Sequence, residues 1–429
     1  MYAIRRVRDI LGLERNILVL CATAILLNLA NSMYGPFLSP YFQSVGATTE
    51  ILGVIFSIMA IANALVMLTG GHLADAYGRK TITVLGSLFM AIFIFPLYFV
   101  GLWYLAVVCL IMVNFGMNIY RPGAYALIVE SLPAEKRATG FSSMGFIAGT
   151  GGILAPTIAG YLALGGDYRL IFLLASVVLF IMTFARQLLL RETKREKQQT
   201  DQEASESPSE EKLSFLKKLR LTWNSGASTR AYILYSVVSS LSGSIAGPYF
   251  ALLYLNTIGL DELQYGWLVS ASLACSLITQ IPGGKVSDRF GRKPLMLLSM
   301  VTGTLATFAI TQTRDFTLLL LIEIVSSTAG GLSSGAFYTL PAELVEKEYR
   351  GTALGVFDSL GRTAGAIGPL LGSLIVANYS FELYPRFVFY ASVLLSIPSV
   401  IVFAIFVRET LRKNTRVAVE EKPTSDKEP

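Results

Sequence analysis

Four ionisable residues interrupt long apolar stretches of this chain: Arg121, Glu323, Asp358 and Arg362. An ionisable group at bilayer depth costs at least about 2.5 kcal/mol, so it normally faces water, a partner or a functional path. Glu323 has no basic residue within one helical turn and therefore needs a proton or a distant partner. Asp358 and Arg362 are four positions apart, so they either neutralise each other or, once separated, leave Asp358 free to take up a proton. The chemistry we expect from this set is reversible proton uptake and the binding of charged groups.

Uncharged polar residues on other apolar stretches could complete a cavity around these groups. Asn31 and Tyr34 are one helical turn apart and share a face. Each such residue taken singly is more typical of a hydrogen bond between helices than of a ligand contact. The candidate cavity residues are Asn28, Asn31, Tyr34, Asn114, Asn118, Tyr120, Tyr235, Ser239, Ser242 and Gln280.

The stretches that carry these residues predict membrane-spanning helices. The chain has 429 residues, of which 53% are hydrophobic and 15% charged, whereas about 25% are charged in soluble domains. Its apolar stretches are each near the roughly 20 residues that cross a bilayer as a helix, and they lack the alternation of a membrane β-barrel. We predict twelve spans, at 16–43, 48–74, 79–101, 103–131, 137–165, 168–190, 229–256, 262–287, 293–313, 316–345, 350–377 and 384–408.

A duplication divides the spans into two sets of six. The segments Gly71–Lys80 and Gly284–Lys293 share the pattern G-x-x-x-D-x-x-G-R-K at an offset of 213 residues, and each joins two apolar stretches. The same offset relates Gly53 to Gly266, Glu130 to Glu343, Arg137 to Arg350, and Pro156 to Pro369. We therefore predict an all-α membrane protein with twelve transmembrane helices in two pseudo-symmetric six-helix bundles. Many secondary transporters consist of parallel repeats with a substrate path between the halves.

Composition also predicts the domain boundaries. Residues 1–190 and 229–408 form the two bundles, and the polar, charged residues 191–228 form a cytoplasmic linker that cannot bury enough apolar surface to fold alone. The later part of the linker, up to Trp223, fits an amphipathic helix on the inner leaflet as well as it fits an incidental mixture of residues. We expect residues 409–429 to be a disordered cytoplasmic tail.

The distribution of basic residues predicts the orientation. If the amino terminus is cytoplasmic, only Arg169, Arg314 and Arg386 of the 35 Lys and Arg residues lie at outer turns, and Arg121 and Arg362 lie within spans. The positive-inside rule then places both termini in the cytoplasm. The net charge of +6 has the same origin, so it does not indicate nucleic-acid binding.

The repeated turn resembles motif A of the major facilitator superfamily, G-x-L-x-D-R-x-G-R-K/R, which joins spans 2 and 3. Ala76 replaces the first Arg of the motif. The matching residues are Gly71, Leu73, Asp75, Gly78, Arg79 and Lys80 in the first copy, and Gly284, Asp288, Arg289, Gly291, Arg292 and Lys293 in the second. With the span count, the repeat and the linker, the resemblance covers essentially the whole chain. It implies a cytoplasmic gate that holds the halves together when the cavity opens outward.

Elementary chemistry gives these residues definite tasks. Gly71 and Gly284 would allow close approach of helices, and Gly78 and Gly291 would allow a sharp turn. Each motif aspartate, Asp75 and Asp288, would pair with the turn Arg or accept from the N–H groups of a helix amino terminus. The resemblance adds Glu130, Arg137, Glu343 and Arg350 to the gate, and the alternative is that these four are ordinary charges at span ends.

Two further motifs are matched only in part. Arg121 takes the place of the Arg in motif B, L-x-x-x-R-x-x-Q-G, although Ala124 and Tyr125 replace the last two residues. The resemblance implies a role for Arg121 in substrate binding or proton coupling, and a structural ion pair is the alternative. The segment 365–372 resembles motif C of antiporters, but span 5 has a looser version, which weakens any inference of antiport. Close helix packing explains both glycine-rich runs.

These features predict a secondary active transporter that works by alternating access, with protons as the coupling ion and no nucleotide-binding loop for ATP. We favour an exporter of drugs or amphipathic compounds. The alternative is a proton-coupled importer of a small organic anion or metabolite, with Arg121 and Arg362 as carboxylate partners. A lipid flippase or a membrane sensor without turnover is less favoured. We expect a monomer in the cell membrane with no cofactor, no metal site, no catalytic site and no nucleic-acid partner.

Overall fold

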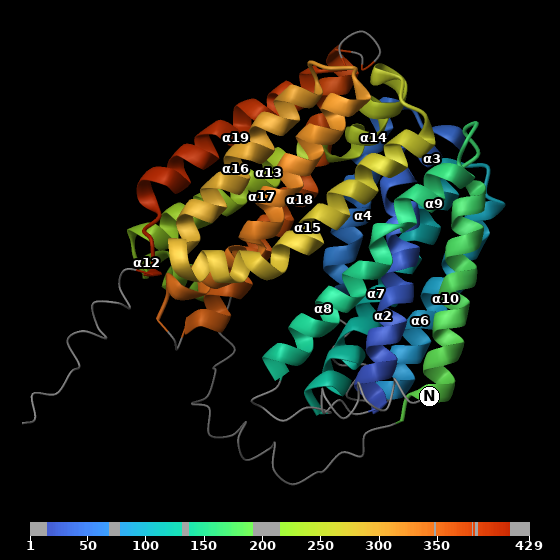
Figure 1. Cartoon of the computed structure of the whole chain (residues 1–429), viewed down its shortest axis with the longest axis horizontal. Helices are drawn as coiled ribbons and strands as arrows, with labels where there is room; N and C mark the ends of the chain where they lie inside the picture. The colour runs from blue at the N-terminus through green and yellow to red at the C-terminus, as the bar shows by residue number, and fades with distance from the viewer. Residues whose placement is uncertain are drawn as a thin grey trace, which may run out of the picture.

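The structure, a computed structural model, describes residues 15–67, 78–130, 137–191, 215–346, 349–379, 381 and 385–411. Figure 1 shows two groups of helices, one from each half of the chain. The first half contains α2 (Arg15–Tyr34), η1 (Gly35–Phe37), α3 (Leu38–Ser44), α4 (Thr49–Met67), α6 (Arg79–Ile94), η2 (Phe95–Tyr98), α7 (Trp103–Glu130), α8 (Arg137–Ile153), α9 (Ala155–Leu162) and α10 (Arg169–Leu189). The second contains α13 (Ala227–Ala246), η4 (Gly247–Tyr249), α14 (Phe250–Leu252), η5 (Leu253–Ile258), α15 (Glu262–Phe290), α16 (Arg292–Ile310), α17 (Phe316–Glu343), α18 (Arg350–Tyr379) and α19 (Phe387–Phe406).

The predicted spans fall on these helices. Eleven helical stretches of the described chain are long and apolar enough to cross a membrane. The remaining predicted span corresponds to α15, which has 29 residues and whose polar side chains, among them Gln280, lower its hydropathy. The all-α, twelve-span prediction is confirmed. The second part of the predicted linker forms a further helix, α12 (Phe215–Asn224), which packs against α18 and α13.

Proline residues mark breaks in several of the spans. The first span of each half changes from α-helix to a 3-10 turn at a Gly-Pro pair, Gly35-Pro36 in η1 and Gly247-Pro248 in η4. Pro156 follows the break between α8 and α9. Proline causes such breaks because it has no N–H to donate and its ring crowds the preceding turn. The spans are therefore bent, and α13 continues through η4 and α14 into the π-helical turn η5.

Glycines bring the helices close together within each half. A Cβ added at Gly86 of α6 would lie 2.6 Å from the backbone nitrogen of Tyr120 on α7. One added at Gly116 of α7 would lie 2.8 Å from the carbonyl oxygen of Gly86. Helices in membranes gain stability from such close backbone approach because lipid supplies no hydrophobic driving force between them. The glycine-rich spans predicted from the sequence also pack closely against neighbouring helices, since Gly151 faces Ile25 on α2 and Gly372 faces Ile245 on α13.

The two halves meet at one end of the molecule and diverge toward the other. Figure 1 shows them converging where α3 and α14 lie, and diverging toward the ends of α10 and α12. We call the first the closed end and the second the open end. At the closed end α4 packs against α18, and α9 packs against α15. The inner parts of α8 and α15 also touch, at Gly149 and Leu277.

The contacts at the closed end repeat the duplication. Gly53 of α4 abuts the carbonyl group of Pro369 on α18, and Gly266 of α15 abuts that of Pro156 on α9. The offset of 213 positions relates one pair to the other, Gly53 to Gly266 and Pro156 to Pro369. Gln43 and Asn256, also 213 positions apart, join across the halves through a hydrogen bond of 3.2 Å from Asn256 Nδ2 to Gln43 Oε1. The internal repeat thus becomes a pseudo-twofold interface.

Candidate transport site and gates

The carboxylate of Glu323 receives hydrogen bonds from two hydroxyl groups. Tyr254 in η5 donates to Oε1 at 2.6 Å, and Ser272 of α15 donates to Oε2 at 3.0 Å. The sequence predicted that this mid-span carboxylate needs a proton or a distant partner, and the structure supplies neutral partners from two other helices. Each carboxylate oxygen of Glu323 therefore has one neutral hydrogen-bond donor.

The Glu323 site is connected to the opposite half. The rings of Tyr254 and Tyr265 lie 5.6 Å apart, and the Tyr265 hydroxyl donates at 3.3 Å to the carbonyl oxygen of Pro36 in η1. A change of charge at Glu323 would alter the hydrogen bond from Tyr254, whose ring packs on this cross-half contact. Glu323 is therefore placed where protonation could influence the closed end.

Asp358 and Arg362 pair with each other on α18. Arg362 Nε donates to Asp358 Oδ2 at 2.7 Å, and the side chains of Arg362 and Asp358 are 50% and 54% exposed, respectively. Arg362 lies seven positions before Pro369, so the pair shares the face of α18 that touches α4 at the closed end. Toward the open end this face has separated from the other half, which explains the exposure. Of the two alternatives from the sequence, the structure has the self-paired form.

Arg121 lies on α7, in the first half. Its side chain is exposed and has no hydrogen bond or ion pair within the described ranges. It comes three and seven positions after Asn118 and Asn114, so the three share one face of α7. Asn118 on this face donates at 2.6 Å to Asn63 of α4, and α4 is the helix that contacts the other half. The unpaired guanidinium is therefore available to an anion between the halves.

The remaining cavity candidates are mostly engaged inside the bundles. Tyr34 donates to Asn31 at 2.7 Å, which confirms their shared face, but the Tyr34 ring packs on Phe172 of α10. Asn28 donates to its own helix at Ala24, and Asn114 to its own helix at Leu110.

In the second half, Tyr235 is 5% exposed and packs against Phe403, a position in the bundle core rather than along a path. Ser242 and Ser392 exchange hydrogen bonds between α13 and α19. Gln280 is exposed on the inter-half face of α15.

The second copy of the gate motif forms a network within its own half. Arg292 pairs with Glu343 at the end of α17 and lies 3.9 Å from Asp288, while Thr410 donates to Glu343 at 2.6 Å. Gly291 has φ of 100° and so makes the sharp turn that was predicted. Arg350 is half-buried, and its Nε has no hydrogen-bond partner within the described chain. Glu343 thus joins the network as expected, whereas Arg350 is not bonded into it.

Glu409 supplies the acidic group at the amino terminus of α16. Its carboxylate accepts from the backbone N–H groups of Arg292 at 3.2 Å and Lys293 at 2.9 Å. Partial positive charge at the start of α16 favours such an anion. The sequence allowed Asp288 either this task or pairing with the turn Arg. Asp288 is exposed and lies 3.9 Å from Arg292, and Glu409 had been placed at the start of the tail.

One glycine expectation needs correction. Among the described residues, a Cβ at Gly284 would meet no atom within 4 Å, whereas one at Gly283 would lie 2.5 Å from the carbonyl oxygen of Leu332 on α17. Close packing of α15 inside its half therefore depends on Gly283. Gly284 lies seven positions after Leu277, which touches the other half, so it faces the gap at the open end.

The first gate copy is described only in part. Gly78 has φ of 88° at the start of α6, which confirms the predicted turn, and Arg79 is the first residue of that helix. Gly71 and Asp75 lie outside the described residues, as do the side chains of Glu130 and Arg137. Their roles stay predictions.

A fully buried arginine was missed in the sequence. Arg186 of α10 is 0% exposed; its Nε donates to Thr23 Oγ1 at 3.0 Å, and its Nη1 donates to Ser87 Oγ. Its guanidinium lies 4.4 Å from the centre of the Tyr120 ring, and Nη2 has no hydrogen-bond partner in the described chain. Arg186 links α2, α6, α7 and α10, and its neighbour Tyr120 precedes Arg121. It was not predicted among the basic residues within spans.

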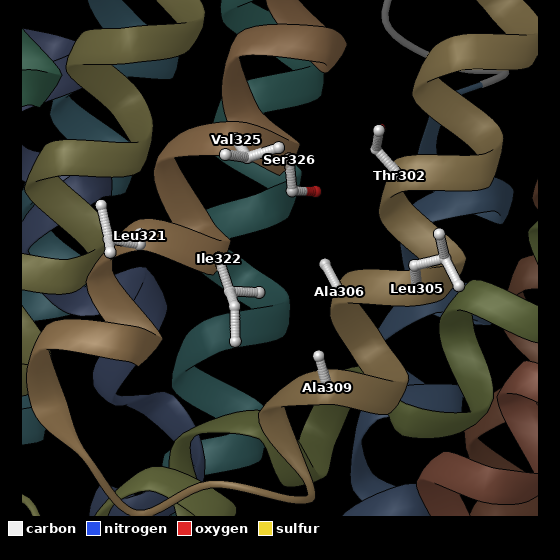
Figure 2. Close-up of a pocket in the computed structure, with 8 residues that line it drawn as sticks. All are labelled: Thr302, Leu305, Ala306, Ala309, Leu321, Ile322, Val325 and Ser326. Atoms are coloured by element: carbon white, nitrogen blue, oxygen red, sulfur yellow. The ribbon is translucent and has the colours of Figure 1, made fainter.

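An apolar cavity lies apart from these groups. It has a volume of about 290 Å³ between α16 and α17, and Figure 2 shows its lining side chains. Ile322 lines it, but the next residue, Glu323, bonds to groups on η5 and α15. In the described part of the chain, no three His, Cys, Asp or Glu side chains gather as a metal site would require.

At the closed end, Tyr168 precedes α10 and joins the halves. Its hydroxyl donates to Glu262 Oε1 at 3.4 Å. Burial, and secondarily the charge of Glu262, raise the pKa of Tyr168, so it is a neutral donor at physiological pH.

Comparison with known proteins gives a consistent assignment. The Major Facilitator Superfamily profile matches residues 20–240 and 232–428. The multidrug resistance protein MdtG of Enterobacter lignolyticus (strain SCF1) is 24% identical over 380 residues, covering 86% of this chain and 87% of MdtG. The nucleoside transporter NupG superposes with a TM-score of 0.76 at 16% identity, over 92% of this chain and 100% of NupG. A D-xylose-proton symporter superposes with a TM-score of 0.72 at 16% identity, over 92% of this chain and 98% of the symporter.

Proposed function

The chain belongs to the Major Facilitator Superfamily, and we propose that it exports drugs or other amphipathic compounds in exchange for protons. The observation that carries this proposal is Glu323, a mid-span carboxylate with two hydroxyl partners next to a contact between the halves. The similarity to a multidrug resistance protein supports the substrate class. In this mechanism a monomer alternates between two states, and Glu323 is neutral in one and charged in the other.

In the alternating step, the closed end would open and the open end would close. Opening the closed end would separate Gly53 from Pro369 and Gly266 from Pro156. Closing the open end would bring the face that carries Gly284 against the first half. We propose that both termini are cytoplasmic, so the present form opens toward the cytoplasm. The scarcity of basic residues at the opposite turns supports this orientation.

The test is transport in proteoliposomes loaded with a pH-sensitive dye. Adding a lipophilic cation should produce proton movement coupled to that of the cation, and Glu323→Gln should abolish the coupled proton movement. Glu346→Gln is the matched control, because Glu346 is an exposed carboxylate beyond the end of α17. Coupled proton movement that persists in Glu323→Gln would remove Glu323 from the mechanism.

Arg121 favours a second candidate, import of a small organic anion. Its guanidinium is exposed and unpaired in the described structure, and arginine binds carboxylates through paired hydrogen bonds. The fold likeness to a proton symporter is compatible with this direction of coupling. Uptake of labelled carboxylates that Arg121→Gln abolishes, together with no response to lipophilic cations, would favour the importer over the exporter.

A further inference from the structure

A second cavity, of about 760 Å³, lies at the closed end and is lined by both halves. Its volume is within the range of small-molecule sites. Its polar lining residues include Gln43 and Thr49 from the first half, and Asn256, Arg314, Arg386 and Tyr390 from the second. It is distinct from the Glu323 site, none of whose hydrogen-bonding residues lines it.

Two arginines in one cavity are unusual at this end of the molecule. The sequence places only three basic residues at the turns on this side, and Arg314 and Arg386 are two of them. None of the described lining residues is acidic. The neighbouring Asp315 is engaged elsewhere, because its carboxylate accepts from the backbone N–H of Leu318 at 2.8 Å and caps α17.

The other groups at the cavity are neutral. The hydroxyl of Tyr390 accepts a hydrogen bond from Gln312 Nε2 at 2.8 Å. The rings of Phe381 and Phe387 add apolar surface to the lining. The charge balance among the described lining residues is therefore positive, with an apolar wall beside it.

The cavity depends on the contact between the halves. Asn256 donates to Gln43 across the interface at 3.2 Å, and both side chains line the cavity. Movement of the halves apart at this end would take Gln43 and Thr49 away from the two arginines. A ligand that touches both sides therefore binds this state in preference to the alternative one and shifts the population toward it.

We propose that this cavity binds an oxyanion, a carboxylate or phosphate group with an apolar body, and that the bound anion holds the closed end shut. Arg314 and Arg386 would contact the oxyanion, and arginine is suited to this because its N–H groups form paired, charge-assisted hydrogen bonds. The same chemistry belongs to a free solute and to the headgroup of an anionic phospholipid.

The binding test uses the full-length protein in nanodiscs and follows its thermal unfolding. Benzoate and inorganic phosphate are added to phosphatidylcholine discs, and phosphatidylglycerol discs form the second arm. Binding raises the unfolding temperature because the ligand favours the folded state. We expect Arg314→Gln and Arg386→Gln each to weaken anion binding at least tenfold. The matched control is Arg169→Gln, which removes the third arginine on this side without touching the cavity.

The two arms of the experiment distinguish a free solute from a lipid headgroup as the ligand. Stabilisation by benzoate or phosphate in phosphatidylcholine identifies a free solute, and stabilisation by phosphatidylglycerol alone identifies a headgroup. The proposal is overturned if no anion stabilises the protein, or if Arg314→Gln with Arg386→Gln retains the same response as Arg169→Gln. For the conformational part, the distribution of spin-label distances between positions 166 and 259 should shift toward the short distance of the closed end when the anion is added. Anion binding that leaves this distance distribution unchanged would overturn that part.

Discussion

Removing a partner of Arg186 should destabilise the protein more than removing Arg186 itself. Thr23→Val would leave the Nε group of a fully buried guanidinium without an acceptor, which costs about 1–3 kcal/mol. Ser87→Ala would do the same at Nη1. Tyr120→Leu would remove a desolvated cation–π contact worth about 2 kcal/mol, together with ring packing.

Replacing Arg186 itself should cost less, because its hydroxyl partners donate their own protons to other groups. Thr23 donates to Val19 O at 2.8 Å, and Ser87 donates to Thr83 O at 2.7 Å, so neither loses a hydrogen-bond acceptor when Arg186 is replaced. Arg186→Met keeps a long side chain and removes a buried cation whose desolvation is costly. We therefore expect its cost to stay within about 1 kcal/mol, and the double variant Arg186→Met with Thr23→Val to cost no more than Arg186→Met alone.

The assay is the free energy of unfolding of the purified protein in mixed micelles, titrated with sodium dodecyl sulfate and read by circular dichroism. Thr183→Val is the matched control on α10, because its buried hydroxyl bonds only to Leu179 of the same helix. The reasoning is refuted if Arg186→Met is more destabilising than Thr23→Val. That result would mean that the cation contributes a net attraction larger than its desolvation cost.

Three further predictions concern the closed end and the gate at the open end. Gly266→Leu should shift the equilibrium toward separation of the closed end, because the new side chain would collide with Pro156. Such overpacking costs about 1–3 kcal/mol, which corresponds to roughly a tenfold change in the ratio of closed to separated molecules. Gly284→Leu should leave the present form intact, because there is space beside Gly284 in this form. It should nevertheless block transport, because the added side chain would prevent the open end from closing. Normal transport by Gly284→Leu would refute the place of Gly284 at the gate. Glu409→Gln should destabilise the start of α16 by about 0.5–2 kcal/mol, measured by faster amide exchange at Lys293, while Glu346→Gln should not.

Much of the fold was evident in the sequence because lipid leaves the backbone few choices. Apolar stretches must form helices there, and the offset of 213 residues predicted equivalent positions that make equivalent contacts at the closed end. The depth of Glu323 was also evident. Its partners, Tyr254 and Ser272, were not, because a lone hydroxyl on a span has no spacing rule that relates it to a carboxylate 51 or 69 positions away.

Charged residues near span ends were the main source of error. Arg186 lies four positions inside a predicted span, where positive residues commonly reach the interface, but α10 turns this side chain into the bundle. The available signal was a pair of small hydroxyl residues, Thr23 and Ser87, on other spans. Gly284 shows a second limit, because a motif that serves one state of a moving protein need not be packed in the other.

The most direct test of alternating movement is a pair of distances measured in the same samples by pulsed electron paramagnetic resonance. The three free cysteines are replaced, and labels are placed at positions 166 and 259 for the closed end and at 191 and 290 for the open end. Substrate and pH are then varied. The account predicts that whenever the first distance lengthens the second shortens. Distances that move together, or a second distance that never shortens, would contradict it.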